Sequence, residues 1–170
     1  LKMQPSFEKY LPWFILREIP FIGNTMYKKL IHQFLSPERV LNSTETQLKK
    51  IDKISEKIIF GIIHHKKFQD KAKKELDKIL NKNIKIVTLT DSSYPALLKQ
   101  IHDPPPFLTY LGELDNSAPC ISIVGSRRAT SYGLSTSENL SYKLAKKGFQ
   151  IVSGMARGID SRAHKGALRA

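Results

Sequence analysis

The sequence predicts an α/β protein in which a parallel sheet follows a small all-α domain. Short strand-like runs at residues 120–124 and 150–153 flank a segment, 135–147, with apolar residues at helical spacing. These apolar residues, which predict one buried helical stripe, are Leu140, Leu144 and Ala145. Strand, helix and strand in this order form a crossover unit, which pairs its strands in parallel. Residues 1–82 read as consecutive helices and are the expected first domain.

Turn and capping residues divide the first domain into five expected helices. Pro12 bends or starts the first helix. Ser36 caps the third, with Pro37 at its first helical position, and Ser43 or Thr44 caps the fourth. The expected helices cover residues 7–17, 25–34, a short stretch from 37, about 47–51, and 55–80.

The pattern changes near residues 81–84, where an alternating, β-branched run begins. Residues 84–89 and 107–112 are expected strands, separated by a short helix at 96–101. We therefore place the second domain at 83–170. A doubly wound sheet needs about five or six parallel strands. This domain is thus expected to be incomplete, and half a sheet is expected to expose apolar surface and unpaired edges.

Charge is the strongest compositional signal. The 170 residues carry 28 Lys and Arg against 15 Asp and Glu, a formal net charge of +13. This excess favours an anionic partner, either nucleic acid or an acidic membrane face, and simple lysine richness is the alternative. We interpret the lysines of residues 66–78 as a solvated helix face rather than a binding stripe.

Cysteine, histidine and hydropathy exclude several classes of protein. Cys120 is the one cysteine and lies in a strand expected to be buried, so neither a disulfide framework nor a zinc cluster is expected, and a reducing cytoplasm is the natural location. The five histidines show no metal-ligand spacing. No run approaches the roughly 18 apolar residues of a membrane span. We expect no metal, no cofactor and no membrane span.

Glycine and arginine residues follow each of the two parallel strands. Because both strands end at the same carboxyl edge of the sheet, the two loops are expected to meet where open α/β sheets bind ligands. Glycine lets the backbone approach a phosphate, helix N-termini point N–H donors at it, and arginine adds charge-assisted bonds. The candidate residues of this phosphate-binding edge are Gly125, Ser126, Arg127, Arg128, Tyr132, Ser153, Gly154, Arg157 and Gly158.

Other chemistries fit the same segments less well. The loops contain neither a G-x-G-x-x-G fingerprint nor a Walker loop, so neither NAD nor ATP is supported. Ser153, Asp160 and His164 suggest a hydrolytic triad, but no G-x-S-x-G elbow is present. Asp160 and His164 stand four residues apart and can pair. We interpret Asp160 as a helix N-cap whose carboxylate accepts backbone N–H groups.

The turn at residues 19–23 is similar to a helix-hairpin-helix, a module that offers backbone N–H groups to DNA phosphates. Phe21 stands where that module carries its first glycine, so a structural helix turn is the preferred interpretation. Aromatic residues nearby either stack bases or form a small core, and we prefer the core. They are Tyr10, Trp13, Phe14 and Phe21.

Three stretches resemble the DNA-processing protein A (DprA/Smf) family. They are Tyr94 to Leu98 continuing through Asp103 to Gly112, Ile123 to Gly133, and Ile151 to Asp160 with Ala163-His164 and Gly166 to Leu168 beyond it. Together they cover about residues 84–170, and the last stretch is the most specific. The first domain resembles the family's variable sterile-alpha-motif-like or helix-hairpin-helix domain.

The resemblance implies a Rossmann-like domain that binds single-stranded DNA without sequence preference and is not an enzyme. In this family such binding protects incoming strands and loads the RecA recombinase during natural transformation. The family pocket implies roles for Arg127, Ser153 and Gly154 on the DNA backbone. It also implies a homodimer formed through a later part of the domain, a part that we expect to be missing from this sequence.

A Rossmann-like hydrolase acting on a nucleotide monophosphate is the rival hypothesis. The same loops would then grip one phosphate, and Asp160 is the candidate catalytic carboxylate. A net charge of +13 fits a polyanion better than a single nucleotide.

Overall fold

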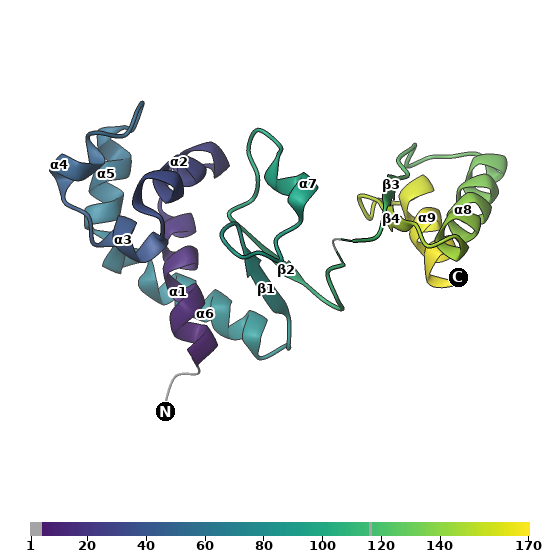
Figure 1. Cartoon of the computed structure of the whole chain (residues 1–170), viewed down its shortest axis with the longest axis horizontal. Coiled ribbons are helices and arrows are strands. Elements are labelled where there is room, and N and C mark those ends of the chain that lie inside the picture. Colours follow the sequence, from purple (N-terminus) through teal and green to yellow (C-terminus); the bar gives the residue numbers. More distant parts are fainter. Residues whose placement is uncertain (1–4, 116) are drawn as a thin grey trace. The chain divides into compact units, whose positions relative to one another are not determined.

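The chain folds into two compact units, of which the first ends at Leu114 and the second runs from Asp115 to Ala170 (Figure 1). The computed structural model describes residues 5–115 and 117–170. The elements of the first unit are α1 (Pro5–Glu18), α2 (Asn24–Phe34), α3 (Pro37–Leu41), α4 (Glu45–Leu48), α5 (Glu56–Ile63), the 3-10 turn η1 (His65–Phe68), α6 (Gln69–Leu80), β1 (Lys85–Thr88), α7 (Ala96–Lys99) and β2 (Phe107–Tyr110). The second unit contains β3 (Cys120–Ser122), α8 (Ser131–Lys146), β4 (Gln150–Val152) and α9 (Ile159–Leu168).

Aromatic residues of α1 form the centre of the first unit. Trp13 stacks on Tyr27 at 5.9 Å, and Phe14 stacks on Phe107 of β2 at 4.4 Å. The hydroxyl of Tyr27 donates to the carbonyl oxygen of Trp13 at 2.9 Å, and burial raises the pKa of Tyr27. Tyr10 is half-buried and donates to the carbonyl of Ile86. The expected aromatic core is confirmed for these α1 residues.

Phe21 is the exception, because 68% of it is exposed. It adopts φ +70°, the left-handed conformation that glycine adopts most easily, in the turn between α1 and α2. Ile19 and Ile22 on either side are buried and anchor this turn in the core. The assignment of Phe21 to the core is therefore wrong, while the expected turn between two helices is observed.

Helix boundaries follow the capping residues closely. Ser36 accepts from the backbone N–H of Arg39, and Pro37 is the first residue of α3, both as expected. Thr44 caps α4, where it and Gln47 form a reciprocal capping box. Helix α1 contains Pro12 within its span.

The expected continuous helix over residues 55–80 is wrong, since η1 separates α5 from α6. His64 leaves the helical conformation at φ −101°, ψ 26°. Its Nδ1 lies 2.9 Å from the carbonyl oxygen of Phe60, and Nδ1 of His65 lies 2.9 Å from that of Ile62. The two imidazoles thus occupy carbonyls at the end of α5, which a capping residue or water must otherwise satisfy.

The β1–β2 hairpin is antiparallel and belongs to the first unit. Its residues Ile86, Val87 and Phe107 join the core of the helices. Sequence composition changes near residues 81–84, which marks the passage from helices to strands. The compact unit extends to Leu114 because the hairpin buries its apolar face on α1.

The second unit pairs β3 with β4 in parallel, as expected, and α8 and α9 lie side by side next to the strands (Figure 1). Helix α8 begins at Ser131, earlier than the expected residue 135, because Thr130 caps it. The predicted apolar stripe is wrong for Leu140, which is 47% exposed, while Ser137 and Ser141 are buried. The two helices approach closely at Gly166 of α9, where a Cβ would overlap the backbone of α8. Only small residues of α8 therefore fit against α9.

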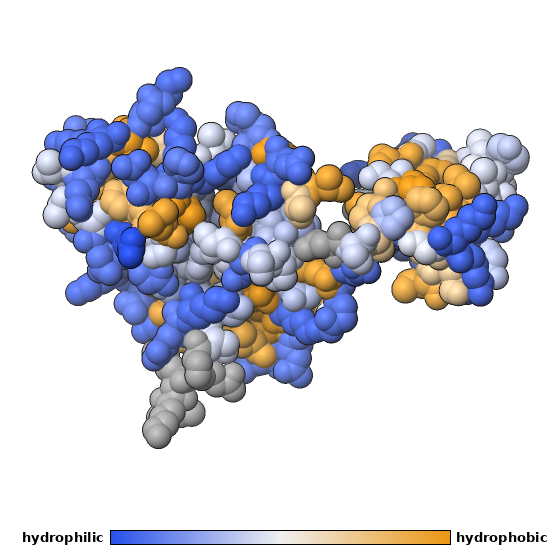
Figure 2. Space-filling view, in the orientation of Figure 1, coloured by the Kyte–Doolittle hydropathy of each residue, from blue (hydrophilic) through white to orange (hydrophobic). Residues whose placement is uncertain are grey.

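Cys120 is exposed, contrary to the expectation of a buried strand. Two paired strands cover too little surface to enclose it, and its thiol lies 3.5 Å from the side-chain oxygen of Gln150. Val124, Val152 and Leu168 are also exposed, at 77%, 48% and 89%. Figure 2 shows hydrophobic residues gathered on the visible face of this unit. The expected exposure of apolar surface is therefore observed.

The described residues contain neither a helix that could cross a membrane nor a cluster of metal-ligating side chains. None of the helices there has the length and apolar character needed to span a bilayer. No group of three or more His, Cys, Asp or Glu residues gathers in the same part of the chain to hold a metal ion.

Asp91 fastens the end of β1, and this makes the stability of the first unit pH-dependent. Burial opposes the ionisation of Asp91. Its carboxylate accepts from the backbone N–H and the hydroxyl of Thr88 at 2.8 and 2.9 Å, and it pairs with the ammonium of Lys9. These contacts outweigh burial and lower the pKa of Asp91 below its ordinary value of 3.8. A lowered carboxyl pKa stabilises the fold above the unfolded value, and the contribution is lost as the pH falls through the folded pKa. We expect Asp91→Asn to reduce the free energy of unfolding at about pH 7 and to match the wild type at about pH 2.

Urea denaturation at a series of pH values measures this difference. Asp103→Asn, at an exposed carboxylate, is the control and should run parallel to the wild type. A difference between Asp91→Asn and the wild type that stays constant with pH would contradict the assignment.

Candidate functional site

The two glycine–arginine loops meet at the carboxyl ends of β3 and β4. The strands pair with Ser122 opposite Val152, and the amide of Ile123 donates to the carbonyl of Val152 at 3.0 Å. The hydroxyl of Ser153 then donates to the carbonyl oxygen of Ile123 at 2.7 Å. This bond fastens the start of the second loop to the start of the first. It also means that the Ser153 proton is engaged, which does not suit a nucleophile.

A direct backbone contact joins the loops further out. The amide of Ile159 donates to the carbonyl oxygen of Ser126 at 3.2 Å. Gly158 has φ +84°, and a Cβ there would overlap the carbonyl oxygen of Ser126 and lie 2.8 Å from that of Arg127. A Cβ on Gly125 would lie 2.6 Å from the side chain of Ile159. Both glycines are therefore required by the packing of one loop on the other.

Asp160 is a buried carboxylate that holds the second loop through hydrogen bonds to its backbone. It is 5% exposed, and its Oδ2 accepts from the amides of Gly154 at 3.1 Å and Ala156 at 3.4 Å. The sequence-based interpretation is correct that the carboxylate accepts backbone N–H groups, but wrong about the N-cap, which is Gly158. Asp160 also does not pair with His164. Oδ1 of Asp160 and Nε2 of His164 are both buried, and neither has a hydrogen-bond partner among the described residues.

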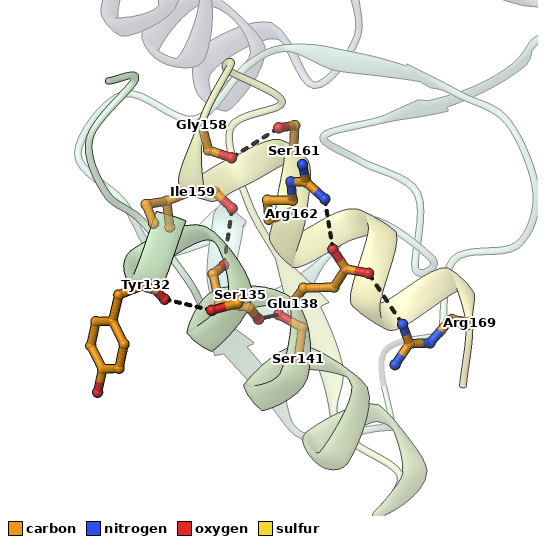
Figure 3. A network of polar contacts seen from close by, with 10 residues as sticks. Tyr132, Ser135, Glu138, Ser141, Gly158, Ile159, Ser161, Arg162 and Arg169 are labelled. Carbon is orange, nitrogen blue, oxygen red and sulfur yellow. Dashed lines mark hydrogen bonds and ion pairs between the residues drawn. The ribbon is translucent and has the colours of Figure 1, made fainter. Parts of the chain in front are cut away.

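The first loop ends in a well-capped helix. The hydroxyl of Ser126 accepts from the amide of Arg128 at 3.0 Å, and that of Thr130 accepts from the amide of Gly133 at 3.2 Å. Tyr132 was expected inside the loop but lies in the first turn of α8, because the helix begins at Ser131. Its side chain is 78% exposed and points away from the contact between α8 and α9 (Figure 3).

The arginines of the loops are exposed and free of ion pairs. Arg127, Arg128 and Arg157 have no acidic partner among the described residues. Residues 115–170 carry nine Lys and Arg against three Asp and Glu, namely Asp115, Glu138 and Asp160. The local charge is thus strongly positive.

Each of these three acids is committed elsewhere in the unit. Glu138 of α8 accepts from Arg162 at 2.9 Å and Arg169 at 3.2 Å, both on α9 or directly after it (Figure 3). The hydrogen bond from Arg162, with the charges of Lys165 and Arg169, lowers the pKa of Glu138. Asp115 accepts from the hydroxyl and amide of Ser117. None of the three therefore neutralises the loop arginines.

This arrangement suits an extended anion. Three unpaired guanidiniums and two glycine-containing loops share one edge, and guanidinium binds phosphate oxygens in bidentate fashion. The structure brings all nine candidate residues into the two loops and the adjoining first turn of α8.

Sequence reasoning missed Met155, which has φ +56° and is 83% exposed, because nothing in its residue type signals that conformation.

Comparisons with known sequences agree on one family. A family model described as DNA recombination-mediator protein A matches residues 85–170. Protein Smf of Synechocystis sp. is 33% identical over 162 residues, which cover 92% of this chain and 40% of that protein. DNA processing protein DprA of Bacillus subtilis is 33% identical over 105 residues, which cover 61% of this chain and 35% of that protein. The chain thus spans well under half the length of these relatives.

A solved structure extends the similarity to the whole fold. The X-ray structure of DNA processing protein A (DprA) from Streptococcus pneumoniae matches with a TM-score of 0.67 at 26% identity. The match covers 99% of this chain and 55% of that chain. The expected fold class, a parallel α/β sheet preceded by a small helical domain, is confirmed.

The contact between the loops predicts that Gly158→Ala is more disruptive than a matched glycine substitution. Gly148 has φ +86°, but a Cβ at this position would have no atom within 4 Å, so Gly148→Ala tests conformational strain alone. We expect about 1–2 kcal/mol of destabilisation for Gly148→Ala. For Gly158→Ala we expect about 1–3 kcal/mol more, because ψ −127° at positive φ lies outside the left-handed region open to other residues and because the Cβ also collides with two carbonyls.

Urea denaturation gives the free energies, and hydrogen exchange of residues 150–170 locates the change. Equal effects of the two substitutions would show that the loops do not pack as described.

Proposed function

We propose that this chain, which belongs to the DNA recombination-mediator protein A family, binds single-stranded DNA without sequence preference. The observation that carries the proposal is the set of three unpaired arginines on two loops that are fastened together. A single-stranded polynucleotide presents successive phosphates at its surface, and binding to phosphate carries no sequence information. A site built from guanidiniums and backbone therefore suits this ligand.

Each candidate residue has a distinct role in the proposal. Arg127, Arg128 and Arg157 bind phosphates, and Tyr132 is a surface on which a base stacks. The glycines let the two loops and Asp160 pack closely on one another, and the hydrogen bonds of the serines hold the loops, so that the cations stay in place. The residues with these latter roles are Gly125, Gly154, Gly158, Ser126 and Ser153.

The cellular role that we propose follows from the family. Relatives named DNA processing protein DprA and the family description of a recombination mediator support a part in DNA processing during natural transformation. We propose that the protein protects incoming strands in the cytoplasm, loads RecA and acts as a homodimer. The positive charge of +13 supports the DNA partner.

The hydrolase hypothesis finds less support in the geometry. Its candidate carboxylate, Asp160, is buried and accepts two loop amides through Oδ2. A general base must reach the proton that it removes. Competition between free nucleotides and oligonucleotides at equal phosphate concentration separates the two hypotheses, since a polyanion site prefers the oligonucleotide.

The proposal predicts that Arg127→Ala weakens binding to every sequence alike. Loss of one charged phosphate contact should reduce affinity for an oligo-dT strand about tenfold at low salt. The slope of log affinity against log salt should become shallower by about 0.7–1 unit. Fluorescence anisotropy at several salt concentrations measures both quantities.

Lys147→Ala is the matched control, because this exposed cation follows the last residue of α8 whereas Arg127 precedes the first. It should leave affinity and slope near the wild-type values. An Arg127→Ala variant with unchanged affinity and slope would remove Arg127 from the interface.

A further inference from the structure

Met155 occupies a conformation that its residue type does not favour. It has φ +56°, in the left-handed region, where a Cβ is penalised. The residues on both sides are held, because the amides of Gly154 and Ala156 donate to Oδ2 of buried Asp160. Asp160 therefore imposes the turn that places Met155 at its outer corner. Non-glycine residues in this region concentrate at functional sites.

The Met155 side chain is not buried in the protein core, so core packing does not offset this conformational cost. It is 83% exposed, one of the most exposed apolar side chains of the chain. It lies between Gly154 and Arg157 in the second loop, and Gly158, three residues later, packs on the carbonyls of Ser126 and Arg127. The loop that presents the Met155 side chain thus also carries Arg157, one proposed phosphate ligand, and contacts the backbone of Arg127, another.

We infer that Met155 contacts the bases of the bound strand, and that Asp160 is the residue that positions it. The inference rests on the proposed function and extends it, because the arginines account for phosphates and leave the bases without a partner in the second loop. An unbranched, polarizable thioether packs on flat aromatic surfaces of varied shape. Such a contact tolerates any base, and exposed methionine is among the apolar residues that proteins insert against base steps.

Two substitutions at Met155 separate this role from a structural one. Met155→Gly removes the side chain and accepts φ +56° without a Cβ penalty, so relief of strain offsets the greater freedom of the unfolded chain and Tm should stay close to that of the wild type. Met155→Leu keeps an apolar side chain of similar volume. Thermal unfolding of the full chain checks that both variants fold.

Binding is measured with a fluorescein-labelled oligo-dT and with a strand of equal length made of abasic sites. We expect Met155→Gly to lose about tenfold in affinity for oligo-dT. Met155→Leu should bind like the wild type, and neither variant should differ from it on the abasic strand. The salt slope should be unchanged in both, because no phosphate contact is removed.

The possible results decide between the explanations. Met155→Gly binding oligo-dT as tightly as the wild type, or losing as much on the abasic strand, would overturn the role of Met155 and leave the proposed function standing. Wild-type chain that fails to bind oligo-dT at all would overturn the proposed function, and the role of Met155 with it.

Discussion

The hydrogen bond from the amide of Ile159 to the carbonyl of Ser126 joins the two loops on which the site depends. Gly158 makes this bond possible, since any side chain there would meet the carbonyls of the first loop. Parallel pairing of β3 and β4 brings the loops to one edge, but pairing alone fixes only their starting points. The contact at Gly158 and Ile159 determines how the loops lie beyond the strands, and with it the separation of the arginines.

The free charge of the arginines is a consequence of how the acids are used. Glu138 is bound by Arg162 and Arg169, so it stabilises the packing of α8 on α9 (Figure 3). Asp160 is buried beneath the second loop, where it accepts two amides. Both carboxylates thus have structural partners away from the guanidiniums of the loops. A cationic edge remains that suits an external anion.

Local signals in the sequence predicted much of this fold, and tertiary packing explains what they missed. Ser36 and Pro37 correctly predicted the start of α3, because capping is a local interaction that the sequence shows directly. The convergence of the loops followed from the topology of a crossover unit. By contrast, Ser141 is buried and Leu140 exposed because α9 approaches α8 too closely for a large side chain, which helical spacing cannot reveal. Met155 was missed because Asp160, five residues later, imposes its conformation.

The central claim is that both loops bind one strand through its phosphates. The salt dependence of oligo-dT binding by the Arg127→Ala, Arg157→Ala double variant tests it most directly, because the two residues lie on different loops. If both contact the same strand, the slope of log affinity against log salt becomes shallower by about 1.4–2 units relative to the wild type, the sum for two phosphate contacts. A double variant with the slope of the Arg127→Ala single variant, or of the wild type, would contradict the claim.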